Sequence, residues 1–131
     1  MDAPALLRAK IPNFPGYGDD QARRLSDELV RAYSGELLSD LQNRIGATGA
    51  TADRLTKVLL RCEFLNQIAF KPYENADLDE TKMESMASAD LQLVDLAEKS
   101  STLDGSSLDT YLDEVESALD LRDHEMETAP A

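Results

Sequence analysis

The chain has 131 residues, with 26 acidic and 13 basic side chains and a formal net charge of −13. This length supports one domain, and the acidic balance disfavours direct binding to nucleic acid or to an anionic membrane. One cysteine, Cys62, excludes an intramolecular disulfide. With no secretory leader and no apolar run of about 18 residues, the sequence predicts a cytoplasmic protein.

The charge is unevenly distributed along the chain. Residues 1–76 carry ten acidic and ten basic side chains, whereas residues 77–131 carry sixteen acidic and three basic ones. The C-terminal part therefore holds the whole net charge of −13. Such a surface favours basic protein partners.

The first eighteen residues predict an extended N-terminal arm. Pro12, Pro15 and two glycines interrupt any helix between residues 11 and 18. Ile11, Phe14 and Tyr17 are too apolar for a solvated tail, so we expect the arm to pack on the bundle. A docking peptide is the alternative, because residues 12–15 match the P-x-x-P template once.

The first predicted helix starts at Asp19 or Asp20, which can cap it, and stops at Gly46. Its apolar residues recur strictly every four positions, so this ridge drifts around the helix. The ridge consists of Leu25, Leu29, Tyr33, Leu37, Leu41 and Ile45. Gly35 lies off the ridge, and no close-packing role is expected for it.

The second predicted helix begins at Thr51 or Asp53, ends before Pro72 and is apolar on two sides, which indicates a central position. Its main face comprises Leu55, Val58, Leu59, Cys62, Leu65 and Ala69. A second ridge of Leu60, Phe64 and Ile68 is covered either by the arm or by a second subunit. Arg54, Lys57 and Arg61 share one side, and we expect them to face the acidic helices.

The third predicted helix opens between residues 75 and 79 and reaches Lys99. Its apolar arc consists of Met83, Met86, Ala87, Leu93, Val94 and Ala97. Asp90 falls within this arc, where an unpaired carboxylate is unfavourable. Either Asp90 meets an arginine, or the helix restarts there with Ser88 as its cap.

The last predicted helix, from Ser107 to Glu127, carries two parallel stripes. The apolar seam consists of Leu108, Leu112, Val115, Leu119 and Met126, with Arg122 in one slot, which suggests that the seam opens to solvent near its end. One residue along, the acidic ridge consists of Asp109, Asp113, Glu116, Asp120, Asp123 and Glu127. Like charges at this spacing destabilise a helix by about 0.2–0.5 kcal/mol per step, so packing or a cationic partner must offset them.

No catalytic or cofactor motif is found. The one histidine, His124, lies in the acidic last helix and is interpreted as solvated, so neither a Ser-His nor a Cys-His pair is plausible. A carboxylate-bundle metal site would need Glu three residues before His124, where Leu121 stands. We therefore expect no enzyme activity, no cofactor and no metal.

The sequence predicts an all-α, single-domain bundle of about four helices. The arm covers residues 1–18, the bundle 19–127 and a disordered tail 128–131. The leading functional hypothesis is a non-catalytic adaptor, chaperone or assembly factor that binds a basic protein. A DNA-mimicking inhibitor and a structural homodimer are the alternatives, and an acidic ridge that is only a solvated surface without a partner is a further one. The partner-binding residues on this hypothesis are Asp109, Asp113, Glu116, Asp120, Asp123, Leu108, Leu112, Val115 and Leu119.

Overall fold

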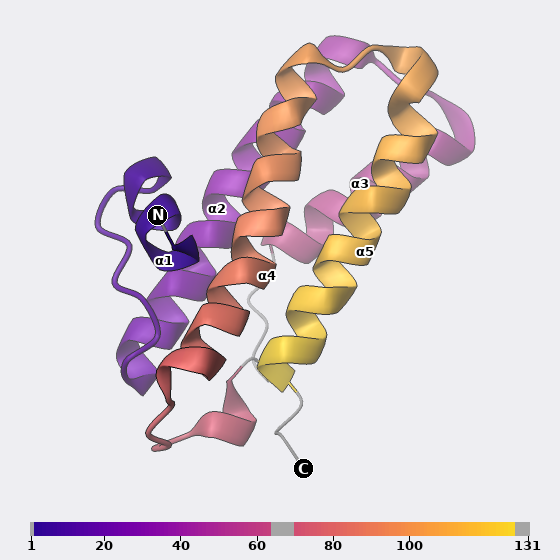
Figure 1. The fold of residues 1–131 in the computed structure, drawn as a ribbon. Coiled ribbons are helices and arrows are strands. Elements are labelled where there is room, and N and C mark those ends of the chain that lie inside the picture. The colour runs from indigo at the N-terminus through magenta and orange to yellow at the C-terminus, as the bar shows by residue number, and fades with distance from the viewer. Residues whose placement is uncertain (1, 64–69, 128–131) are drawn as a thin grey trace.

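The computed structural model describes residues 2–63 and 70–127, which form helices and connecting loops (Figure 1). The described residues contain five α-helices and three short 3₁₀ turns. The α-helices are α1 (Ala3–Lys10), α2 (Asp20–Ile45), α3 (Gly49–Glu63), α4 (Glu80–Lys99) and α5 (Leu108–Glu127). The all-α prediction is confirmed, and the described helices number one more than predicted.

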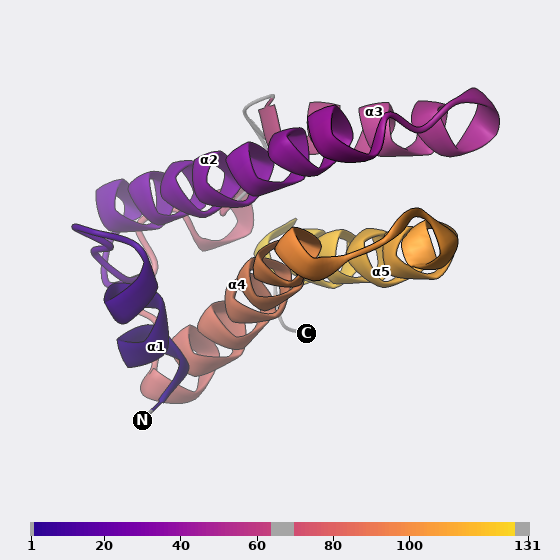
Figure 2. The ribbon, with the colours of Figure 1, turned by 90° about the horizontal axis from the view of Figure 1, so that it is seen from above.

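The helices stack as two layers, seen from above in Figure 2. Helices α2 and α3 run in opposite directions and form one layer, and α4 and α5 form the other. Helix α4 packs on α2, α5 packs on α3, and α1 lies beside α4. None of the described helices is long and apolar enough to cross a membrane.

Local capping determines the ends of the long helices. The Asp19 carboxylate accepts a hydrogen bond from the Ala22 amide at 2.7 Å, and Gly46 takes the left-handed conformation that ends α2 (φ 62°). Asp79 accepts from the Lys82 amide at 2.8 Å and starts α4. These bounds agree with the prediction, whereas α3 begins at Gly49, slightly earlier than expected.

The predicted extended arm is wrong for residues 3–10, which form α1. Asp2 caps this helix by accepting a hydrogen bond from the Ala5 amide at 3.0 Å, and Pro4 lies in its first turn, where proline is tolerated. Residues 11–18 are not helical, as their prolines and glycines predict. The buried apolar residues of this whole N-terminal segment are Ala3, Leu7, Ile11, Phe14 and Tyr17.

The apolar ridge of α2 is not its buried face. Leu25 is 41% exposed, and Leu41 is the one fully buried member. The buried face instead combines apolar and polar side chains, namely Arg23, Ser26, Asp27, Val30, Arg31, Ser34, Leu38 and Leu41. Five of these eight buried side chains are polar, so the spacing of hydrophobic residues in the sequence does not reveal the buried face of α2.

Gly35 has a close-packing role, contrary to expectation. A Cβ added at Gly35 would lie only 3.2 Å from the Cβ of Cys62, so α2 and α3 approach closely at this point. Cys62 belongs to the buried face of α3 with Leu55, Val58 and Leu59, as predicted. The predicted positions Phe64, Leu65, Ile68 and Ala69 lie outside the described residues, as does the predicted tail 128–131.

Arg23 joins three parts of the chain. Its buried guanidinium donates to the carbonyls of Tyr17 (2.9 Å), Tyr73 (3.0 Å) and Ala76 (2.8 Å). The Phe70 amide donates to the Met126 carbonyl at 2.7 Å. Residues 70–79 are thus fixed against α2 and the end of α5.

Candidate interaction surface

The apolar seam of α5 lies in the core of the bundle. Leu108, Leu112, Val115 and Leu119 are at most 2% exposed, and Met126 is fully buried. Their packing against α4 and α3 places the acidic ridge at the edge of the helix. The seam therefore positions the ridge, and the polar side of α5 faces solvent.

Two arginines of α3 bind the acidic ridge. Arg54 reaches Asp113 at 2.6 Å, Glu116 at 3.2 Å and Asp109 at 3.6 Å. Two helical turns further on, Arg61 reaches Asp123 at 2.8 Å and Asp120 at 3.0 Å. The structure therefore agrees with the predicted orientation of this stripe, although no carboxylate partner of Lys57 is seen among the described residues.

These contacts change the electrostatics of the arginines. The hydrogen bonds that the Arg54 guanidinium donates to Glu116 and Asp113 raise its pKa. Partial burial lowers the pKa of Arg61, but the hydrogen bonds and charges of Asp123 and Asp120 outweigh it and raise the pKa overall. Because Asp109, Asp113 and Asp120 remain 70–74% exposed, solvent screens these pairs and each contributes little to stability.

A buried charge cluster connects α5 to the rest of the fold. Its members are Tyr17, Asp27, Arg31, Asp90 and Arg122, all at most 5% exposed. Arg122 donates to the Asp90 carboxylate at 2.6 Å and also binds Asp27. Arg31 binds Asp27 at 3.0 Å, and the Tyr17 hydroxyl donates to Asp90. Two carboxylates and two guanidinium groups make the cluster electrically neutral.

Burial in the cluster changes the pKa values of Asp90 and Tyr17. Burial raises the pKa of Asp90, although Arg122 and the Tyr17 hydroxyl oppose the shift. Burial also raises the pKa of Tyr17 well above its ordinary value, and the charge of Asp90 adds to the effect. The tyrosine therefore stays protonated and able to donate its hydrogen bond.

The structure resolves the two alternatives for Asp90. Helix α4 continues through this position, and Arg122 is the arginine that Asp90 meets. The suggestion that Arg122 opens the seam to solvent is wrong, because the side chain is 2% exposed. In the sequence, Asp90 interrupts the apolar arc of α4 and Arg122 interrupts the apolar seam of α5. These two interruptions were the signal from which the ion pair could have been predicted. Asp27 and Tyr17 gave no such signal.

Cys62 and His124 occupy unlike environments. Burial raises the pKa of the Cys62 thiol, so the reactive thiolate is disfavoured. His124 lies on the exposed side of α5. Within residues 2–63 and 70–127, no group of three or more His, Cys, Asp or Glu side chains is placed to hold a metal ion.

Comparison with protein-family models, with curated protein sequences and with solved structures finds no match for this chain.

The buried tyrosine predicts a loss of stability in alkali. An unfolded tyrosine releases its proton near pH 10, whereas folded Tyr17, facing Asp90, Arg122 and Asp27, retains it. The unfolded state then binds fewer protons, so stability falls as pH rises above about 10, by up to about 1.4 kcal/mol per pH unit for this group. Cys62 and Tyr111, whose pKa values burial also raises, act in the same direction.

The contribution of Tyr17 is measurable by urea unfolding of the wild type and of Tyr17→Phe between about pH 9 and 11.5. The variant is expected to be less stable at neutral pH, because Asp90 loses a donor, but to show a shallower alkaline decline. Equal slopes for the two proteins would contradict this assignment.

Proposed function

We propose that this chain is a non-catalytic interaction protein that binds a basic protein partner through the acidic ridge of α5. The observation that supports the proposal is the exposure of the ridge. Five of its carboxylates share two guanidinium groups, and three of these carboxylates are 70–74% exposed in spite of those contacts. The ridge keeps an excess of negative charge toward solvent.

The contacts within the chain illustrate the chemistry a partner would use. Arg54 and Arg61 lie seven residues apart, two helical turns, and each binds two or three ridge carboxylates. Lysine or arginine side chains of a partner would approach the same carboxylates from the solvent side. Such complementarity accelerates association and selects the partner more than it increases affinity.

A rigid backbone beneath the ridge favours this role. The apolar seam is buried, and Arg122 fixes α5 to Asp27 of α2 and Asp90 of α4. The carboxylates are therefore presented at fixed spacing before a partner arrives, which lowers the entropy lost on binding.

The ridge can be tested by the double substitution Asp109→Lys with Asp120→Lys. Arg54 keeps Asp113 and Glu116, and Arg61 keeps Asp123, so we expect the fold to be retained. Capture from a cell lysate at low and at high salt, with identification by mass spectrometry, should show basic proteins bound by the wild type at low salt. The double variant should retain about tenfold less of them.

The matched control is Glu28→Lys with Asp40→Lys, which makes the same charge change on exposed positions of α2. It should capture the same proteins as the wild type. If the ridge variant and the α2 variant behave alike, net charge rather than the ridge governs binding, and the proposal is wrong.

A further inference from the structure

The whole guanidinium group of Arg54 faces the acidic ridge. Its Nε donates a hydrogen bond to Glu116 at 3.2 Å, and one terminal nitrogen donates to Asp113 at 2.6 Å. The other terminal nitrogen lies 3.6 Å from the Asp109 carboxylate and donates to the Asp109 carbonyl at 3.4 Å. All three nitrogens of this arginine are therefore engaged by α5.

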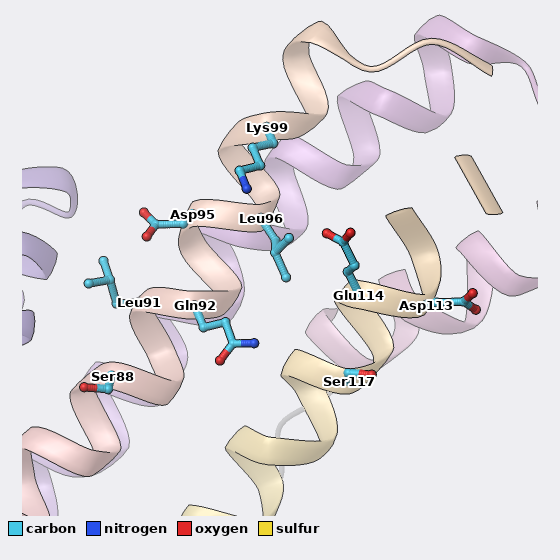
Figure 3. Close-up of a pocket in the computed structure, with 9 residues that line it drawn as sticks. All are labelled: Ser88, Leu91, Gln92, Asp95, Leu96, Lys99, Asp113, Glu114 and Ser117. Atoms are coloured by element: carbon cyan, nitrogen blue, oxygen red, sulfur yellow. The ribbon is translucent and has the colours of Figure 1, made fainter. Parts of the chain in front are cut away.

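Neighbouring carboxylates of α5 face different surfaces of the helix. Asp113 points away from α4, whereas Glu114 points into the shallow hollow between α4 and α5 (Figure 3). Arg54 reaches Asp113 from α3, which packs on α5. The acidic ridge is therefore the surface of α5 on which the cations of α3 act.

Arg61 repeats the contact two helical turns along α3. One of its terminal nitrogens lies 2.8 Å from Asp123 and 3.0 Å from Asp120. The side chain of Asp123 is 33% exposed, whereas that of Asp120 is 74% exposed. The arginine therefore covers the inner carboxylate of this pair and shares the outer one with solvent.

These contacts reduce the charge that the ridge presents to a basic partner. The ridge has six carboxylates, and the two guanidinium groups change its charge from −6 to −4. A cation that arrives from solvent meets carboxylate oxygens already in use. The arginines belong to the same chain, so their effective concentration at the ridge is high and they lose little translational freedom on binding it.

From this arrangement we propose that Arg54 and Arg61 form an intrachain inhibitory contact, which occupies the ridge in the free protein and which a basic partner displaces. The proposal rests on the proposed function, because it concerns the regulation of the same ridge. The buried apolar seam and Arg122 hold α5 in place, so the ridge keeps its shape when the arginines leave. The contact selects partners that present several cations at once, because a single cation gains no more than the displaced arginine loses.

The test is the double substitution Arg54→Gln with Arg61→Gln. Fluorescence anisotropy measures the binding of a labelled peptide of eight lysines at low and at high salt. The variant should bind this peptide about fivefold more tightly than the wild type at low salt, because the carboxylates are no longer shared. The gain should shrink at high salt, where exposed charges are screened.

Circular dichroism melts verify that the double variant is folded. If it is not, the single variants Arg54→Gln and Arg61→Gln carry the same test, with an expected gain of about twofold each.

The matched control is Arg8→Gln with Lys57→Gln, which removes the same two positive charges. Both side chains are exposed, and neither forms an ion pair with another of the described residues. Lys57 also lies between the two arginines on α3, so the control includes a charge close to the ridge. It should bind the lysine peptide within about twofold of the wild type. Equal gains in the two double variants would show that net charge, rather than the contact, governs binding.

Displacement can be followed directly by NMR. The Nε–Hε signal of Arg54 is assigned by its loss in Arg54→Gln. In the free chain this group donates to Glu116, so its signal should move toward that of a solvated arginine as the lysine peptide is added to the wild type. A signal that stays in place at saturation would show that the lysines bind without displacing the arginine, and the proposal would be wrong.

Failure of the inhibitory contact is distinguishable from failure of the proposed function. If the wild type binds the lysine peptide, Asp109→Lys with Asp120→Lys weakens binding and the arginine variants gain nothing, the ridge stands and the inhibitory contact is wrong. If no form of the protein binds the peptide, or if the ridge substitutions leave binding unchanged, both proposals fail.

Discussion

Replacing Arg122 with methionine is expected to lower the free energy of unfolding by about 3–5 kcal/mol, the range for breaking a buried ion pair. Arg122 holds two carboxylates, and among the ion pairs of the described residues it is the cation that meets Asp90. The substitution preserves most of the side-chain volume, so the loss measures an uncompensated buried charge. Urea unfolding at neutral pH gives the value.

Two comparisons make this expectation specific. Arg24→Met removes an exposed arginine whose nearest carboxylate is 4.0 Å away, and its effect should stay within about 0.5 kcal/mol. Combining Arg122→Met with Asp90→Leu and Tyr17→Phe removes the orphaned charge and its hydroxyl partner, and should recover much of the loss. A cost below about 1 kcal/mol for Arg122→Met alone would show that the cluster is not what fixes α5.

The destabilised variant should also respond to pH. Burial already raises the pKa of Asp90, and removing the Arg122 cation raises it further. Folded Asp90 then binds its proton more tightly than unfolded aspartate does, so the stability of the variant increases as pH falls toward the unfolded value. Its deficit relative to the wild type should therefore be smaller at pH about 5 than at pH about 8.

Substituting Phe14 with alanine is expected to destabilise the protein by about 3–5 kcal/mol, as large-to-small changes of buried aromatic residues do. Phe14 is 4% exposed and packs edge-on against Tyr17 with ring centroids 5.7 Å apart. The cavity left behind would also loosen Tyr17 and its hydrogen bond to Asp90. Thermal and urea unfolding, with limited proteolysis of residues 1–18, measure the effect.

Leu25→Ala is the control for Phe14→Ala, because Leu25 is 41% exposed on α2 and its truncation should cost less than about 1 kcal/mol. Phe14→Ala should also make the N-terminal segment sensitive to protease well before global unfolding. A variant as stable and as resistant as the wild type would show that this segment is not part of the cooperative core.

The buried cluster and the α3 arginines support α5 from two sides. Arg122 holds its inner face through Asp27 and Asp90, while Arg54 and Arg61 bind its acidic edge. The repulsion within the acidic ridge, about 1–2.5 kcal/mol in low salt, is therefore offset partly inside the chain. A partner would add cations to a helix that is already held in place.

The regular parts of the fold follow from local sequence. Asp19, Gly46 and Asp79 mark helix ends through backbone capping, which depends on neighbours within a few residues. The period of the apolar seam correctly identified the inner face of α5, and the charge stripe on α3 correctly indicated the contact with the ridge. In each case the residues of a single helix were enough to make the prediction.

The polar interior depended on residues far apart in the chain. Arg122 and Asp27 are 95 positions apart, and Tyr17 and Asp90 are 73 apart. Asp27 alone resembles an exposed residue, and only the convergence of all four side chains makes burial of their charges favourable. Helix α1 was missed because the interruptions at residues 11–18 were extended to the residues before them, although Asp2 and Pro4 form a usable start.

For this protein, the sequence by itself determined an all-α chain, the main helix ends, the inner face of α5 and the concentration of negative charge in residues 77–131. These properties depend on hydrogen bonds and side-chain periods within single helices. The tertiary structure alone decided that Arg122 lies inside the bundle, that Gly35 meets Cys62 and that a shallow hollow lies between α4 and α5. The reason is physical: pairing of buried charges, close helix contact and surface shape exist only after separate helices have packed together.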